Sequence, residues 1–176
     1  MTLQLVAPDH QALWDRVPDF GGNAGDLRKT ARDMHALMHR TFGCGIAAPQ
    51  VGLRLRMFVL DPRPFKHQQF GGARVCINPV VVHLGGPPME AWEGCLSWPG
   101  QRVKVVRSEQ IVAEYTDLRG KRIREEFFGI WARGVQHETD HLDGKCIWTR
   151  ESVQQPPAPN PGPIDPPRPP HDQAVA

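Results

Sequence analysis

Apolar residues along the chain recur first with the period of a helix. Between Asp26 and Phe42 most of them stand three or four residues apart, after a glycine-rich entry. Such spacing gathers side chains on one helical face, which a core can cover. The pattern predicts one N-terminal helix over residues 26–42. Its apolar face would consist of Leu27, Ala31, Met34, Leu37, Met38 and Phe42.

Segments with the shorter period of strands follow this helix. They are rich in β-branched residues or alternate in character, and they cover residues 54–61, 74–82, 103–106 and 110–116. A turn is predicted at Asp117–Gly120, and the strand that returns from it carries Ile123 and Phe127. These segments predict short antiparallel strands.

Near Ile130 the period becomes helical again. Ile130, Gly134, His137 and His141 share a face, so this face of the second helix is expected to point to the interior. The whole pattern predicts an α+β fold. In it, small antiparallel β-sheets pack around this central helix, with one N-terminal helix beside them.

The composition divides the chain near residue 150. Between Pro156 and Pro170 stand nine of the 18 prolines, with almost no large apolar residue. Such a segment buries too little surface to offset the entropy lost on ordering. We therefore predict one folded domain over residues 1–150 and a disordered or polyproline-like tail over residues 151–176.

Charge and composition argue against several classes of partner. The net charge of +2 is too small to indicate a nucleic-acid or polybasic membrane surface. No segment approaches the roughly 20 apolar residues of a membrane span. The first residues do not resemble a secretory signal, and the four cysteines form no C-x-x-C pair. We expect a cytoplasmic protein with free thiols and neither a nucleic acid nor a membrane as direct partner.

The second helix carries the motif His137-Glu138-Thr139-Asp140-His141. Two imidazoles four residues apart on a helix can bind one divalent metal ion, and Glu138 can take a proton from a metal-bound water. The motif therefore indicates metal-assisted hydrolysis, but many zinc peptidases share it. Asp140 is expected to orient a ligand or to pair with an arginine.

A third ligand has to come from elsewhere in the chain. Cys95, in Glu93-Gly94-Cys95-Leu96-Ser97, would complete a set of three ligands and leave a position open for water. Gln50, after a stretch of small residues, offers a hydrogen-bond donor. The downstream alternatives are Glu151, Asp165, His171 and Asp172.

Three segments in this order resemble the peptide deformylase family. Its patterns G-x-G-x-A-A-x-Q, E-G-C-L-S and Q-H-E-x-D-H-L correspond to Gly43–Gln50, Glu93–Ser97 and Gln136–Leu142. The resemblance implies a hydrolase that removes the formyl group from N-formyl-methionyl peptides, which are nascent chains at the ribosome. It also implies one divalent metal ion, most often Fe²⁺, with Zn²⁺, Ni²⁺ and Co²⁺ as alternatives.

The resemblance also implies the role of each site residue. Cys95, His137 and His141 would hold the metal, and Glu138 would be the general base for a metal-bound water that attacks the formyl carbon. Gln50 and the backbone N–H of Leu96 would stabilise the charge that develops on the formyl oxygen. The substrate-binding residues would be Cys44, Gly45, Gly94, Ile130, Arg133 and Gly134.

Other interpretations remain open at this stage. The two histidines could be core residues, and Cys95 a buried apolar residue. The protein could be a divergent metallopeptidase or amidase, or a binding protein that keeps the fold without catalysis. Arg133 is expected to point outward with its charge in solvent, and His35 and His39 are expected to be surface residues.

The composition of the tail gives a first prediction. Truncation after Arg150 should leave both the melting temperature and the formyl-peptide turnover nearly unchanged, because proline-rich polar sequence contributes little burial. Thermal unfolding and a turnover assay on the truncated chain test this. A large fall in melting temperature would show that the tail packs on the domain.

Overall fold

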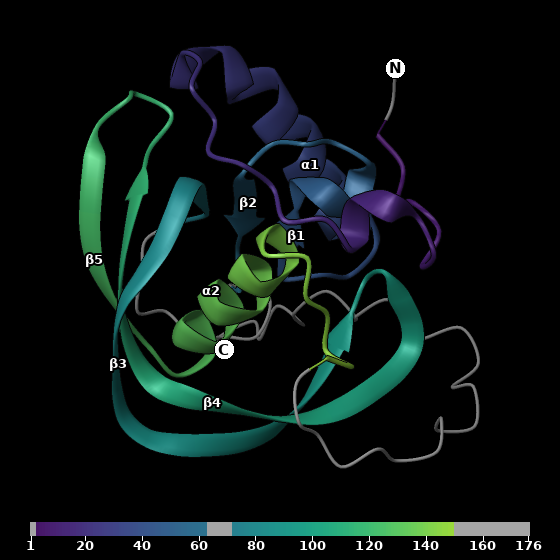
Figure 1. Ribbon diagram of the computed structural model, residues 1–176, viewed down its shortest axis with the longest axis vertical. Helices are drawn as coiled ribbons and strands as arrows, with labels where there is room; N and C mark the ends of the chain where they lie inside the picture. The colour runs from purple at the N-terminus through teal and green to yellow at the C-terminus, as the bar shows by residue number, and fades with distance from the viewer. Residues whose placement is uncertain (1–2, 63–71, 150–176) are drawn as a thin grey trace, which may run out of the picture.

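The computed structural model of the protein describes residues 3–62 and 72–149. Within them, one antiparallel sheet has the strand order β1-β2-β3-β4-β5, and two α-helices pack against it (Figure 1). The strands are Gly45–Ala47, Met57–Leu60, Arg74–Cys95, Trp98–Thr116 and Arg122–Phe128, in the order β1 to β5. The helices are α1 (Arg28–Arg40) and α2 (Gly129–Leu142), and 3₁₀ turns span Gln11–Leu13, Ala24–Leu27 and Ala48–Val51. The α+β prediction is confirmed, but a single five-stranded sheet replaces the predicted small sheets.

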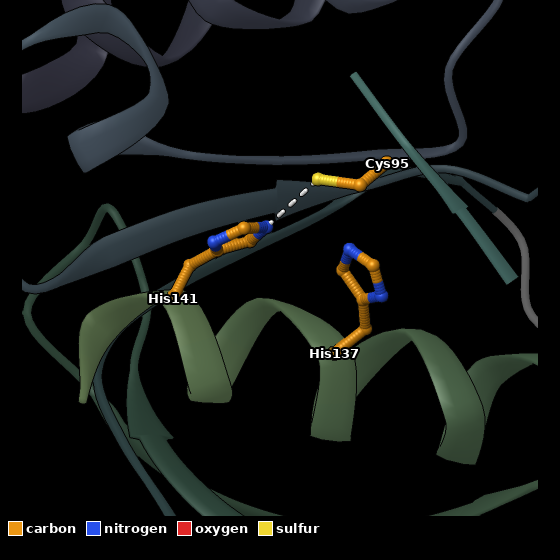
Figure 2. Close-up of side chains that lie close together, drawn as sticks. All are labelled: Cys95, His137 and His141. Atoms are coloured by element: carbon orange, nitrogen blue, oxygen red, sulfur yellow. Dashed lines mark hydrogen bonds between the residues drawn. The ribbon is translucent and has the colours of Figure 1, made fainter. Parts of the chain in front are cut away.

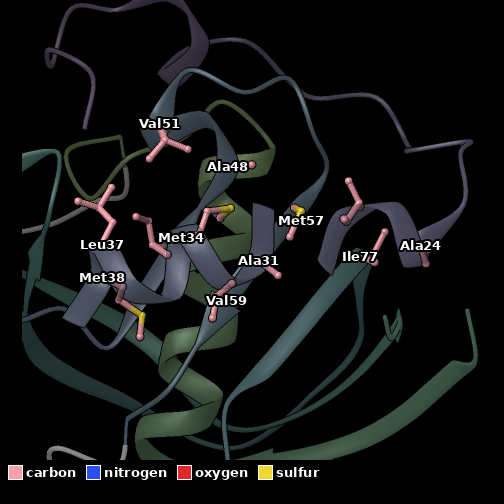
Figure 3. Close-up of a cluster of buried hydrophobic side chains, with 12 residues drawn as sticks. Ala24, Ala31, Met34, Leu37, Met38, Ala48, Val51, Met57, Val59 and Ile77 are labelled. Carbon is pink, nitrogen blue, oxygen red and sulfur yellow. The ribbon is translucent and has the colours of Figure 1, made fainter. Parts of the chain in front are cut away.

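Strand β2 is buried on both of its faces. Successive side chains of a strand point to opposite sides. Met57 and Val59 pack in the cluster around α1 (Figure 3), whereas Phe58 and Leu60 pack in the cluster around α2. The two helices therefore lie on opposite faces of this part of the sheet. This explains why the short strand reads as a continuous apolar run rather than an alternating one.

Strands β3 and β4 form a long curved ribbon around α2 (Figure 1). The sequence predicted β3 only as far as residue 82, but the strand continues through Gly85 and Pro88 to Cys95. Register shifts, one of them between Gly85 and Pro88, accommodate residues that cannot pair regularly. The two alternating runs predicted at 103–106 and 110–116 belong to the single strand β4.

Two sequence predictions concern the ends of the domain and possible membrane segments. The tail predicted for residues 151–176 lies outside the described residues. Among the helices of the described segments, none combines the length and apolarity that a membrane crossing requires.

Helix α1 ends two residues earlier than predicted. The chain leaves the helix at Thr41, and Phe42 adopts a left-handed conformation with φ of 57°. The N–H of Gly43 then donates to the carbonyl of Met38, which closes the helix end. The Phe42 side chain is 65% exposed, so little packing offsets its backbone strain.

A substitution at Phe42 should therefore stabilise the protein. A non-glycine residue in this conformation costs about 1–2 kcal/mol, part of which glycine loses again through its greater freedom in the unfolded chain. Phe42→Gly should raise the free energy of unfolding by about 0.5–1 kcal/mol. Denaturant unfolding measures this. Phe42→Ala is the control, because alanine keeps the strain, and an equal gain in both variants would contradict the explanation.

Candidate active site

Helix α2 presents both histidines of the motif on one side. His137 and His141 are one helical turn apart, and their rings lie with centroids 5.1 Å apart toward the same region (Figure 2). The helix is closed at its end by backbone bonds from Asp143 to Thr139 and from Lys145 to Asp140. The two rings therefore project from a helix whose C-terminal end these bonds fix.

Cys95 reaches these histidines from the tip of the β3–β4 ribbon. Cys95 pairs with Trp98 across a two-residue turn, and its Sγ lies 3.1 Å from Nε2 of His141 (Figure 2). Trp98 stacks parallel to the His141 ring, with an interplanar angle of 6°. The hairpin and the helix thus bring together residues that are more than 40 positions apart in the sequence.

The donor atoms of Cys95, His137 and His141 fit a metal ion. All lie within 4.8 Å of one another, and Cys95 and His141 are buried. A thiolate and two imidazoles are ligands that Zn²⁺ and Fe²⁺ accept. Burial lowers the pKa of His141 well below its ordinary value, which favours the neutral ring that metal ligation requires. Burial alone would also lower the pKa of His137, but hydrogen bonds with Cys95 and Glu93 outweigh it and raise this pKa, so His137 would release a proton when it binds a metal.

Glu138 lies beside this cluster in a buried position. Burial raises the pKa of its carboxyl group to about 7. Its Oε2 atom is buried and has no hydrogen-bond partner among the described residues. The carboxylate fits against β1 only because residue 45 is glycine, since a Cβ there would lie 2.1 Å from Oε1 of Glu138.

Glu93 connects the ribbon to the motif helix. Its Oε2 atom lies 2.9 Å from Nδ1 of His137, so that ring can donate to the carboxylate and keep its other nitrogen for the cluster. Arg107 donates to both carboxylate oxygens of Glu93, at 2.6 and 2.9 Å, and to Asp140 at 2.8 Å. Burial alone would raise the pKa of Glu93, but the hydrogen bonds from His137 and Arg107 outweigh it and hold this pKa well below its ordinary value.

The predicted orientation of Arg133 is wrong. Its guanidinium does not extend into solvent but donates to Glu93 at 2.6 Å and to the carbonyls of Val105 and Met89. The side chain is only 17% exposed. A buried carboxylate and two carbonyls accept hydrogen bonds from this charge, so it does not need the solvent that the prediction gave it. Arg133 therefore belongs to the ion-pair cluster of Glu93.

Gln50 is anchored at both ends of its amide. Its Oε1 accepts from the N–H of Ala47 at 2.8 Å, and its Nε2 lies 3.4 Å from Sγ of Cys95 and 3.1 Å from Oγ of Ser97. Leu96 lies in the turn after Cys95, and its side chain fills the space that a Cβ on Gly43 would occupy. Gln50 and the backbone of Leu96 thus flank the same thiol.

The predicted substrate-binding residues other than Arg133 occupy three different places. Cys44 and Gly45 lie at the start of β1, next to Glu138, and burial raises the pKa of the Cys44 thiol to about 12. Gly94 is exposed at the end of β3. Gly134 faces Leu60 of β2, because a Cβ there would lie 2.5 Å from a Leu60 methyl, and Ile130 packs partly buried on the cluster around α2.

Arg107 is the residue near the site that sequence reasoning missed. The inward positions of β4 run Val103, Val105, Arg107 and then Ile111, so a charged residue stands in an otherwise apolar series. This interruption of the pattern is a signal for a buried ion pair, because an unpaired charge cannot be buried. The sequence indicated the role of Glu93 more weakly, only through its position two residues before Cys95.

Comparison with known proteins defines the family. The sequence model of polypeptide deformylases matches residues 4–156. A peptide deformylase of Endomicrobium trichonymphae is 41% identical over 135 residues, 73% of this chain and 77% of that protein. The crystal structure of peptide deformylase from Thermotoga maritima superposes with a TM-score of 0.78 at 34% identity, covering 85% of this chain and 97% of that one. A class I type b peptide deformylase from Acinetobacter baumannii, in a structure described as Met-Ala-Ser bound, gives 0.77 at 32% identity, covering 85% and 98%.

These matches define both the class and the family of the protein. It is an enzyme, a hydrolase that acts in the processing of newly made proteins. The chain belongs to the peptide deformylase family, whose members depend on a metal and deformylate nascent chains.

The position of Glu93 generates a prediction about metal binding. Glu93→Gln should weaken the affinity of the protein for its metal by about 10–100-fold, because the His137 ring loses a charged acceptor. Metal affinity can be measured by competition with a chelator. Glu90→Gln is the matched control, since Glu90 lies on the same strand, is exposed and pairs only with Lys104 among the described ion pairs. Equal affinities in the two variants would show that Glu93 does not support the ligand.

Proposed function

We propose that the protein removes the formyl group from the N-terminal formyl-methionine of new polypeptides and releases formate. One divalent metal ion would be held by Cys95, His137 and His141. The observation that carries this proposal is the convergence of these three donors beside the buried carboxyl group of Glu138. When bound, the metal would supply Lewis-acid activation, which lowers the pKa of a water to about 7.

Glu138 would act as the general base. As a carboxylate it takes a proton from the attacking water and later passes it to the leaving amine of the peptide. A base works best with a pKa near the working pH, and burial places the pKa of Glu138 at about 7. Gly45 leaves room for the carboxylate, because a Cβ at this position would overlap Oε1 of Glu138.

Gln50 and Leu96 would stabilise the developing negative charge on the formyl oxygen. The Nε2 group of Gln50 is oriented toward Cys95 before any substrate arrives, because Ala47 fixes the other end of the amide. Preorganised donors of this kind are each worth about 10²–10³ in rate. The N–H of Leu96, in the turn after Cys95, would be the second donor.

The peptide would bind as an added strand beside β1. In the described part of the sheet, β1 is an edge strand that pairs with β2 only. Cys44 and Gly45 lie on this edge next to Glu138, and Gly94 is exposed at the end of β3. Backbone pairing there would give affinity, and pockets for alternate side chains would give selectivity. The structure of the Acinetobacter baumannii relative is described as Met-Ala-Ser bound, and Met-Ala-Ser is a methionyl peptide.

The metal and the setting of the reaction are part of the same proposal. Thiolate and imidazole ligands accept Fe²⁺, Zn²⁺, Ni²⁺ and Co²⁺, and we propose Fe²⁺ because the family resemblance implies it. Metal analysis of protein purified without oxygen tests this choice. The substrates would be nascent chains at the ribosome in the cytoplasm.

Two rival functions predict different substrate preferences. A divergent metallopeptidase or amidase would cleave acetyl-methionyl or unblocked peptides as well, and a binding protein would turn over none of them. A comparison of kcat/KM for formyl-methionyl, acetyl-methionyl and unblocked peptides separates the three. Turnover restricted to the formyl peptide supports the proposal, and any other result contradicts it.

A pair of variants should separate metal binding from proton transfer. Cys95→Ala should lose most of the metal bound at the active site, and all activity, because it removes a ligand of that site only. Glu138→Ala should keep the metal but lose at least ~10²-fold in kcat, because it removes only the base. Metal analysis and formyl-peptide kinetics on both variants test this. Full metal content in Cys95→Ala, or unchanged kcat in Glu138→Ala, would contradict the assigned roles.

A further inference from the structure

A second pair of histidines with the same helical spacing lies outside the active site. His35 and His39 are one turn apart on α1, and both face Asp61, which follows β2. The Oδ2 atom of Asp61 lies 2.9 Å from Nε2 of His35 and 3.3 Å from Nε2 of His39. The two ring nitrogens are 3.1 Å apart. Three potential ligand atoms therefore form a nearly equilateral triangle.

The size of this triangle matches a coordination sphere. Ligand nitrogens and oxygens at the usual 2.0–2.2 Å from a tetrahedral metal ion are about 3.3 Å apart. The three measured separations, 2.9, 3.1 and 3.3 Å, are at or slightly below that value. The separations are therefore compatible with one ion in contact with all three atoms.

The surroundings of the three side chains favour an ion that keeps water. Asp61 is completely buried, and its backbone N–H donates to the carbonyl of Cys44 at 2.7 Å, so one ligand is fixed. The His35 and His39 side chains are 33% and 41% exposed. Solvent can thus reach the two rings and supply the fourth ligand.

We propose that His35, His39 and Asp61 bind a second divalent transition-metal ion, with Zn²⁺ as the best-suited occupant. Two imidazoles and a carboxylate without a thiolate suit Zn²⁺, whereas Mg²⁺ and Ca²⁺ prefer sets made only of oxygen. The ion would join α1 to the end of β2. Because Asp61 also holds Cys44, the ion would brace the segment that leads into β1. The competing explanation is that the three side chains only share protons in a hydrogen-bonded cluster.

The experiment removes the first site so that the second can be counted. Full-length Cys95→Ala protein is equilibrated with Zn²⁺, freed of unbound metal by gel filtration and analysed for metal. We expect about one equivalent of Zn²⁺, and none after His35→Ala and His39→Ala are added. Loss of a ligand should weaken Zn²⁺ affinity at least ~10-fold, since loss of an outer partner alone costs about 10–100-fold. The matched control is His83→Ala, which removes an exposed histidine of β3 and should leave the metal content unchanged.

A spectroscopic measurement covers the case in which the triple variant fails to fold. Co²⁺ bound through Cys95 gives a thiolate charge-transfer absorption, whereas Co²⁺ at His35, His39 and Asp61 gives only ligand-field bands. Titration of the wild-type protein should therefore show two equivalents, only one of which carries the thiolate absorption. Cys95→Ala protein that holds no Zn²⁺, or a wild-type titration that ends after one equivalent, would overturn the proposal and leave a proton-sharing cluster. Zn²⁺ binding that survives loss of both histidines would overturn it as well.

Discussion

The buried carboxylate of Glu93 is the interaction on which the rest of the site depends. It accepts hydrogen bonds from Arg107 on β4 and from Arg133 and His137 on α2, so it joins the long ribbon to the motif helix at one point. Removing one member of a buried ion pair leaves an uncompensated charge that costs about 3–5 kcal/mol. Glu93 therefore holds the fold together at the place where it orients the His137 ring, and stability and chemistry cannot be separated there.

A second constraint is the absence of side-chain volume at Gly45. The short strand β2 is covered by α1 on one face and α2 on the other, and it holds β1 close to α2. Glu138 approaches the β1 backbone so closely that any Cβ at residue 45 would overlap it. The carboxyl group thus lies out of water, and its raised pKa follows from that burial. The pKa of this base is therefore raised mainly by the surrounding core and not by one neighbouring charged group.

The sequence predicted features that depend on neighbouring residues, but not features that depend on contacts between residues far apart in the chain. The spacing of His137 and His141 and the change of period near Ile130 are properties of one helix, so they could be predicted. The length of β3 could not, because its irregular positions are tolerated only by pairing with β4. The prediction for the orientation of Arg133 was wrong, because its partner Glu93 lies 40 residues away and no local pattern reveals that contact. The burial of Arg107 could have been predicted, because the sequence places a charged residue at an inward position of an alternating strand.

The two histidine pairs show how the same local pattern acquires different chemistry. On α2 the pair is buried with a thiol, and the carboxyl group of Glu138 beside it is not one of the three candidate ligands, so it is available to move a proton. On α1 the pair is partly exposed, and the neighbouring carboxylate of Asp61 already faces both rings. Coordination to a metal ion lowers the basicity of a carboxylate, so Asp61 as a ligand would be a poorer base than a carboxyl group that is not coordinated. An ion held by α1 would therefore brace the fold near β1, whereas only the α2 site combines an open metal position with a separate base.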